Sequence, residues 1–282
     1  PIHDLWHNDR EVWYNGRYCT ELITEKAVDF IERGSDDPFL VYASYNAPHY
    51  PMHAPKAYLD RYPDLPPDRR IMAAMISAVD DGVGSIVKAL KDGGEYENTL
   101  IFFSSDNGPS RETRNWLDGN EDLYYGGTAG IFRGHKGSLY EGGIREPAIL
   151  AYPGTIGSGQ AIEIPCAMFD FFPTAFEVAG LPLPDHQIDG TSVLGLVTGQ
   201  DETPHEKLFW EYGPNQLAVR EGNWKLVLNG REDGVDGVEE AHLVDLSKDL
   251  GEKKNLAEQE PDVLVRLTKE VQQWDVKIGG HN

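Results

Sequence analysis

Apolar residues recur at three- and four-residue steps in two stretches of the chain. Between residues 69 and 92 they form one stripe, which consists of Ile71, Met75, Val79, Val83, Ile86 and Leu90. Residues 19–33 repeat this spacing, and each stretch is followed by glycine. The periodicity predicts two amphipathic helices that end at these glycines.

Short continuous apolar runs occupy residues 39–44, 99–104 and 148–152. Runs of this length are typical of strands buried on both faces, as in a parallel sheet. The first two lie on either side of the longer predicted helix. The order strand, loop, helix, strand predicts an α/β sheet.

The pattern changes near residue 205. Short alternating segments at 208–212, 217–221, 224–229 and 242–246 predict antiparallel strands, and Gly222-Asn223 suits a two-residue hairpin turn. A closing helix is predicted from Pro261. We therefore expect a larger α/β body over residues 1–204 and a small α+β subdomain over residues 205–282.

Composition excludes several classes of protein. With 25 basic and 47 acidic residues, the formal charge is 25 − 47 = −22, so a nucleic-acid partner would be repelled. No apolar run approaches the roughly 20 residues of a membrane span. The two cysteines, Cys19 and Cys166, exclude a disulfide-dense scaffold and a Cys-rich zinc module. They could form one bridge, so the redox compartment stays open.

The first candidate site follows the predicted strand at 99–104. Asp106 and Asn107 offer hard oxygen donors at the carboxyl end of that strand, where α/β sheets bind ligands. Such oxygens suit Ca²⁺ or Mg²⁺, and Gly108 would let the chain turn so that both face one ion. An Asx turn that closes the strand is the alternative.

The second candidate is His49, which follows the run at 39–44 and is fenced by Pro48 and Pro51. An imidazole held in a stiff loop can act as general acid or base near neutral pH. A surface loop with incidental histidines is the alternative.

The third candidate is Lys136, framed by Gly134 and Gly137 within the glycine-rich stretch 107–143. Glycines allow close backbone approach to a ligand, and a lysine there can clamp an anion. The spacing is not that of a Walker A loop. A flexible basic turn is the alternative.

Together these segments resemble the sulfatase family of the alkaline-phosphatase-like superfamily. The matching stretches occur in order along nearly the whole chain: residues 39–51, 98–108, 133–147, 169–181 and 242–256. The resemblance implies an alkaline-phosphatase-like mixed or parallel sheet sandwiched by helices. It also implies a sulfuric ester hydrolase that acts on an aryl or carbohydrate sulfate.

Residue roles follow from the resemblance. Asp106 and Asn107 would bind a divalent cation, usually calcium with magnesium as an alternative. Lys136 would bind a sulfate oxygen, and His49 would protonate the leaving oxygen. Arg133 and His135, with the loop 109–130, would line the substrate mouth.

The chain also departs from the family pattern. The family nucleophile is a formylglycine made from the Cys or Ser of Cys-x-Pro-Ser-Arg, and neither Cys19 nor Cys166 stands in that context. The early Asp-Asp metal pair is not found either. We therefore expect the C-terminal portion of a sulfatase, inactive by itself, with sheet edges covered by a preceding segment or an oligomer partner.

Two other functions stay open. A phosphodiesterase or phosphonate hydrolase of the same superfamily would share the metal and anion chemistry. A non-catalytic homologue that binds sulfated glycans would explain the missing nucleophile motif. The lack of an Asn-x-Ser/Thr sequon favours an exported bacterial protein over a lysosomal one, and localisation stays open.

Overall fold

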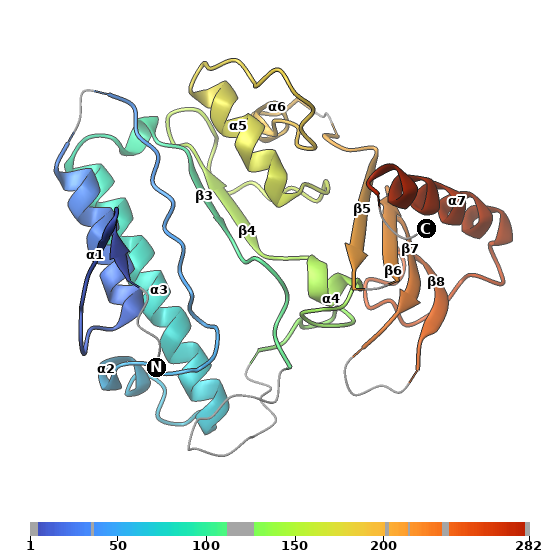
Figure 1. Cartoon of the computed structure of the whole chain (residues 1–282), viewed down its shortest axis with the longest axis horizontal. Coiled ribbons are helices and arrows are strands. Elements are labelled where there is room, and N and C mark those ends of the chain that lie inside the picture. The colour runs from blue at the N-terminus through green and yellow to red at the C-terminus, as the bar shows by residue number, and fades with distance from the viewer. Residues whose placement is uncertain are drawn as a thin grey trace. The chain divides into compact units, whose positions relative to one another are not determined.

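A computed structural model describes residues 5–34, 37–111, 127–200, 203–213, 215–232 and 237–279. Among these, residues 5–96 form one compact unit and residues 97–279 form a second (Figure 1). The boundary predicted at residue 204 falls inside the second unit and stays a prediction. None of the helices in the described part of the chain is long and apolar enough to cross a membrane.

Two packed helices, α1 and α3, make up most of the first unit. Its elements are β1 (Trp6–His7), β2 (Arg10–Glu11), α1 (Cys19–Glu32), α2 (Lys56–Leu59) and α3 (Pro67–Asp92). Both long helices match their predicted positions, and Gly34 follows α1 with φ +67°. The helices cross at Gly82, where a Cβ would lie 2.4 Å from the Thr24 hydroxyl. This close approach explains a glycine inside a long helix.

The strand predicted at residues 39–44 is wrong. The segment carries no strand, and its residues alternate between partly buried and exposed instead of being buried on both faces. Leu40 and Tyr42 are 74% and 87% exposed. Phe39 packs on α1, with its ring 6.0 Å from the Phe30 ring between centroids. An apolar run favours an extended backbone, but a β-strand also requires a neighbouring strand to which it is hydrogen-bonded.

The first half of the second unit carries a two-stranded antiparallel sheet, β3 (Ile101–Ser104) with β4 (Ala148–Ala151). Both strands were predicted, but they pair antiparallel and are not buried on both faces as expected for a parallel sheet. Phe102 of β3 stacks on Phe171 of α5 at 5.1 Å. The remaining elements here are η1 (Tyr96–Asn98), α4 (Glu141–Ile144), η2 (Met168–Asp170), α5 (Phe171–Val178) and α6 (Leu194–Val197). Phe103 and Ile149 are exposed, which leaves apolar surface on this sheet.

The C-terminal part is a four-stranded antiparallel sheet covered by one helix (Figure 1). Its elements are β5 (Lys207–Tyr212), β6 (Gln216–Glu221), β7 (Trp224–Gly230), β8 (Glu239–Asp245) and α7 (Pro261–Lys277). Gly222 has φ +56° in the β6–β7 turn, as a two-residue hairpin requires. Leu267 and Val271 of α7 pack on Leu226 and Leu243, all fully buried. The predicted antiparallel strands and closing helix are confirmed, and their bounds as a separate subdomain stay a prediction.

We expect Leu267→Ala to destabilise this subdomain by about 2–5 kcal/mol, because it opens a cavity at a fully buried site. Hydrogen exchange of the β6 and β7 amides measures this effect separately from the first unit. Val265→Ala, on the exposed face of the same helix, is the control and should change stability by less than about 0.5 kcal/mol. Equal effects of the two substitutions would contradict the packing described.

Candidate functional site

The turn after β3 is built by a close approach of two backbones. The Gly108 N–H donates to the Gly143 carbonyl at 3.1 Å. A Cβ on Gly108 would lie 2.0 Å from the Gly142 carbonyl oxygen, so only glycine fits. The Asp106–Asn107 pair is thereby held against the glycine-rich segment. Asn107 also closes the turn itself, since its Nδ2 donates to the Gly108 carbonyl at 3.0 Å.

The segment that carries Lys136 is a closed loop. The Gly142 N–H donates to the Arg133 carbonyl at 2.6 Å, and Gly134 and Gly137 adopt φ values of +87° and +86°. The Lys136 N–H donates to the Pro109 carbonyl at 3.0 Å. The structure therefore brings together two of the three predicted constellations, the Asp106–Asn107 turn and the Lys136 loop.

Arg133 and His135 lie in the same loop with different surroundings. The Arg133 guanidinium forms ion pairs with Glu232 and, at 3.1 Å, with Glu239, and it lies 3.8 Å from the centroid of the Tyr140 ring. His135 is only 2% exposed, with Nδ1 2.8 Å from the Lys136 carbonyl oxygen. Two carboxylates offset the charge of Arg133, and His135 is almost fully buried. Contact of Arg133 or His135 with the substrate therefore stays a prediction.

Glu146 is a carboxylate that the sequence analysis missed. Asp106 follows β3 by two residues and Glu146 precedes β4 by two residues, so both lie at the same end of the β3–β4 pair, beyond Ser104↔Ala148. Its Oε1 is buried and has no hydrogen-bond partner among the described residues. Burial, and secondarily the charge of Asp106, raise the pKa of Glu146 to about 7. Only the pairing of two strands 44 residues apart in the chain, Ser104 against Ala148, reveals this neighbour.

These side chains match a hard divalent cation in kind but not in number. Asp106, Asn107 and the unpartnered oxygen of Glu146 are all oxygen donors, which Ca²⁺ and Mg²⁺ prefer. In the described ranges, no three His, Cys, Asp or Glu side chains are grouped to hold a metal. Calcium takes 6–8 oxygens, so these residues fit as part of a coordination sphere.

His49 belongs to the first unit. Its Nδ1 lies 2.7 Å from the Tyr50 carbonyl oxygen, and its ring stacks on the Tyr50 ring at 4.4 Å. The His49 N–H donates to the Asn46 carbonyl at 2.9 Å, which makes a turn around the imidazole. These contacts orient the exposed ring, and both the stiffness of its loop and its approach to Lys136 stay predictions.

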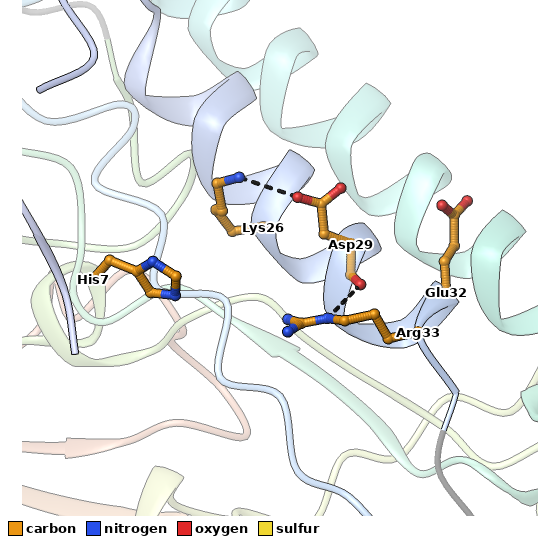
Figure 2. A pocket seen from close by; sticks show the side chains of 5 residues that line it. All are labelled: His7, Lys26, Asp29, Glu32 and Arg33. Atoms are coloured by element: carbon orange, nitrogen blue, oxygen red, sulfur yellow. Dashed lines mark hydrogen bonds and ion pairs between the residues drawn. The ribbon is translucent and has the colours of Figure 1, made fainter. Parts of the chain in front are cut away.

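A surface hollow of about 450 Å³ lies in the first unit (Figure 2). Its lining residues are His7, Lys26, Asp29, Glu32 and Arg33. Lys26 Nζ pairs with the Asp29 carboxylate at 3.1 Å, and Arg33 Nε donates to the Asp29 carbonyl at 3.0 Å. The two cations and two anions offset one another, so the hollow does not select an anionic ligand.

Comparison with known proteins decides the family. A sequence model of the sulfatase family matches residues 1–181, and one described as N-sulphoglucosamine sulphohydrolase, C-terminal, matches residues 127–277. The chain belongs to the sulfatase family. It is 33% identical over 256 residues to human arylsulfatase A, which covers 82% of this chain and 48% of that protein. With human steryl-sulfatase it shares 34% identity over 203 residues, covering 71% of this chain and 33% of that protein.

Solved structures confirm the alkaline-phosphatase-like fold class. The sulfatase-family chain superposes on Ps i-CgsB, crystallised with k-i-k-neocarrahexaose, with a TM-score of 0.79 and 29% identity. The match covers 95% of this chain and 57% of that one. The chain thus spans about a third to a half of the curated sulfatases named above.

Sulfatases generally use a divalent metal and a formylglycine. Cys19 and Cys166 are free thiols outside the Cys-x-Pro-Ser-Arg context. Burial raises the pKa of both, to about 11 for Cys166, where the charge of Asp170 adds to the effect. Their sequence context, and not their pKa, sets both cysteines apart from the residue that becomes formylglycine.

Proposed function

We propose that this chain is part of a sulfuric ester hydrolase that cleaves an aryl or carbohydrate sulfate. The observation that carries the proposal is the junction between the Asp106–Asn107 turn and the Lys136 loop, made by two backbone hydrogen bonds. It joins a carboxylate and amide that suit a cation to an ammonium that suits an anion. Cleavage of a sulfate ester requires both, because charge develops on the sulfate oxygens and on the leaving group.

Each residue then has a defined task. Lys136 offsets negative charge on a sulfate oxygen. Asp106 and Asn107 would hold a divalent cation as part of its coordination sphere, and we propose Ca²⁺ ahead of Mg²⁺ because calcium is the usual metal of the family that the sequence resembles. When bound, that cation would polarise the sulfate oxygens. His49 donates a proton to the departing oxygen. Arg133 and His135 shape the loop beside the substrate.

The nucleophile lies outside the chemistry that we assign to this chain. Neither cysteine fits the formylglycine position, so we derive no attack on sulfur from residues 1–282. Because the chain spans half or less of its curated relatives, we expect residues 1–282 alone to show no sulfatase turnover. Measurable hydrolysis by the purified chain would contradict this part of the proposal.

A carbohydrate substrate is supported by one structural relative. Ps i-CgsB, 29% identical to this chain, was crystallised with k-i-k-neocarrahexaose. The loop 109–130, which the sequence analysis placed at the substrate mouth, lies largely outside the described residues. Its Arg and aromatic residues suit a sulfated sugar by type. We therefore propose a sulfated carbohydrate ahead of a simple aryl sulfate.

Paired substrates test the proposal. We expect the protein encoded by the complete reading frame to hydrolyse an aryl sulfate at least about 100-fold more efficiently, in kcat/KM, than the matching aryl phosphate. A preference for phosphate would instead support a phosphoester or phosphonate hydrolase, a class represented among structures of similar fold. No hydrolysis of either substrate, combined with binding of sulfated oligosaccharide, would support a non-catalytic homologue.

A further inference from the structure

A buried ion cluster links the Lys136 loop to the C-terminal sheet. Lys225 of β7 is fully buried, and its Nζ lies 2.9 Å from Glu141 Oε1 and 3.0 Å from Glu252 Oε1. Glu141 and Glu252 are 1% and 0% exposed. Glu252 Oε2 also accepts the Glu141 N–H at 2.5 Å. The Lys225 ammonium thus pairs with both carboxylates, and the Glu252 carboxylate also binds the loop backbone at Glu141.

The cluster is more elaborate than stability alone requires. Exchanging buried ion pairs for apolar side chains of similar size is often neutral or stabilising, so a fully buried Lys between two Glu is weak evidence of a stability role. Burial opposes ionisation of Glu141, but the charges of Lys225, Arg220 and Arg145 together outweigh burial and lower the pKa of Glu141. Arg220, at 3.4 Å from Glu141 Oε2, supplies further positive charge. Glu141 is therefore held as an anion at a defined place.

The backbone conformation of Glu252 also indicates that the cluster has a specific role. Its φ is +49°, in the left-handed region that non-glycine residues rarely adopt. A turn would ordinarily place Gly or Asn there. A glutamate kept in this conformation, with its carboxylate fully buried, indicates that its side chain is needed at that position.

Glu239 of β8 tethers both ends of the loop to the C-terminal sheet, through Tyr140 at one end and Arg133 at the other. Tyr140, fully buried, donates its hydroxyl proton to Glu239 Oε2 at 2.9 Å. The same carboxylate pairs with Arg133. A Cβ on Gly230 of β7 would lie 2.4 Å from the Tyr140 hydroxyl. The loop is thus fixed at residue 133 and at residues 140–141, with Lys136 between.

From this arrangement we propose that Lys225 and Glu252 are positioning residues for the anion site. They fix Glu141, which ends the loop, and the closed loop in turn fixes the backbone of Lys136 against Pro109. Neither residue touches substrate. The inference rests on the proposed role of Lys136 in sulfate binding and deepens it, because the C-terminal subdomain becomes part of the binding machinery.

A triple variant tests the proposal in the protein encoded by the complete reading frame. Lys225→Met, Glu141→Gln and Glu252→Gln together remove the buried ammonium and both of its carboxylates, and the amide oxygen introduced at position 141 still faces Arg220. We expect cooperative thermal unfolding to persist while the amides of Lys136 and Gly142 exchange about tenfold faster. The dissociation constant for inorganic sulfate, measured by calorimetry, should rise about tenfold.

The same sheet offers a matched control. Lys207 of β5 also holds two carboxylates, Glu221 at 3.2 Å and Glu270 at 2.8 Å. The triple variant Lys207→Met, Glu221→Gln, Glu270→Gln should leave loop exchange and sulfate affinity unchanged. If the Lys225 triple variant does not fold, Glu252→Gly replaces it, because glycine adopts the positive φ freely and Lys225 and Glu141 remain a balanced pair.

The outcomes separate the two proposals. A folded Lys225 or Glu252 variant with the loop exchange and sulfate affinity of the wild type would overturn the positioning role. So would equal effects in the Lys207 control. If the wild-type protein does not bind sulfate, or if Lys136→Ala leaves sulfate affinity unchanged, the proposed function of the loop fails. Hydrogen exchange of the Lys136 and Gly142 amides would still show whether the cluster holds the loop in place.

Discussion

Replacing Lys136 by alanine is expected to lower kcat/KM for a sulfate ester by about 10²–10³-fold in the protein encoded by the complete reading frame. The ammonium is the cationic group that we place on the developing sulfate charge, and the loop that carries it is closed by the Gly142–Arg133 hydrogen bond. Because the backbone is held without the lysine side chain, the substitution should not disturb the fold. Steady-state kinetics and the inhibition constant of inorganic sulfate measure the loss.

A second lysine provides the control for charge. Lys248 is exposed and pairs with Asp245 at 2.7 Å in the same unit. Lys248→Ala changes the net charge as Lys136→Ala does, so a general electrostatic effect would appear equally in both. Lys136→Arg keeps the charge but replaces a compact ammonium by a planar fork, and it should recover part of the activity. Retention of more than a tenth of kcat/KM by Lys136→Ala would remove Lys136 from the site.

The C-terminal subdomain was predictable because its signals are local. Alternating side chains marked the strands, and the turn between β6 and β7 requires a positive φ that Gly222 supplies. The helix α7 carries its apolar stripe at helical spacing and begins with Pro261 at a position where proline is favoured. Each element could therefore be located from a window of a few residues.

Residues 39–44 show that strand pairing cannot be predicted from the sequence of one segment alone. They alternate in burial as a strand does, yet no ladder forms along them in the structure. The hydrogen bonds of a strand belong to its neighbour as much as to itself. An apolar run therefore predicts extended backbone reliably and predicts sheet membership only where a partner strand is present.

The site was predictable as residue types and not as contacts. Glycines framing Lys136 indicated close backbone approach, but nothing local indicated that Gly108 would meet Gly142 and Gly143. The ion cluster is more distant still, since 84 residues separate Glu141 from Lys225 and 111 separate it from Glu252. A lysine in an alternating strand is ordinarily read as solvent-facing. Only the tertiary fold turns this one inward.

Replacing Asp106 by alanine is expected to abolish binding of the divalent cation. Asp106 is the only carboxylate in the predicted pair, and a hard cation depends on anionic oxygen far more than on an amide. The Asn107 side chain is already engaged in closing its turn, which leaves it unable to replace the lost charge. Metal content of the dialysed protein should fall from about one equivalent to less than about a tenth, and calorimetry should detect no Ca²⁺ binding.

Two further variants test whether the loss of metal is specific to Asp106. Asp185→Ala removes an exposed carboxylate elsewhere in the second unit and should leave metal content unchanged. Glu146→Gln should weaken binding less than Asp106→Ala, because it keeps an oxygen near Asp106 while removing the charge. Wild-type metal content in Asp106→Ala would place the cation elsewhere. A loss in Glu146→Gln equal to that in Asp106→Ala would instead show that the strand register, and not the Asp106–Asn107 turn alone, defines the ligand set.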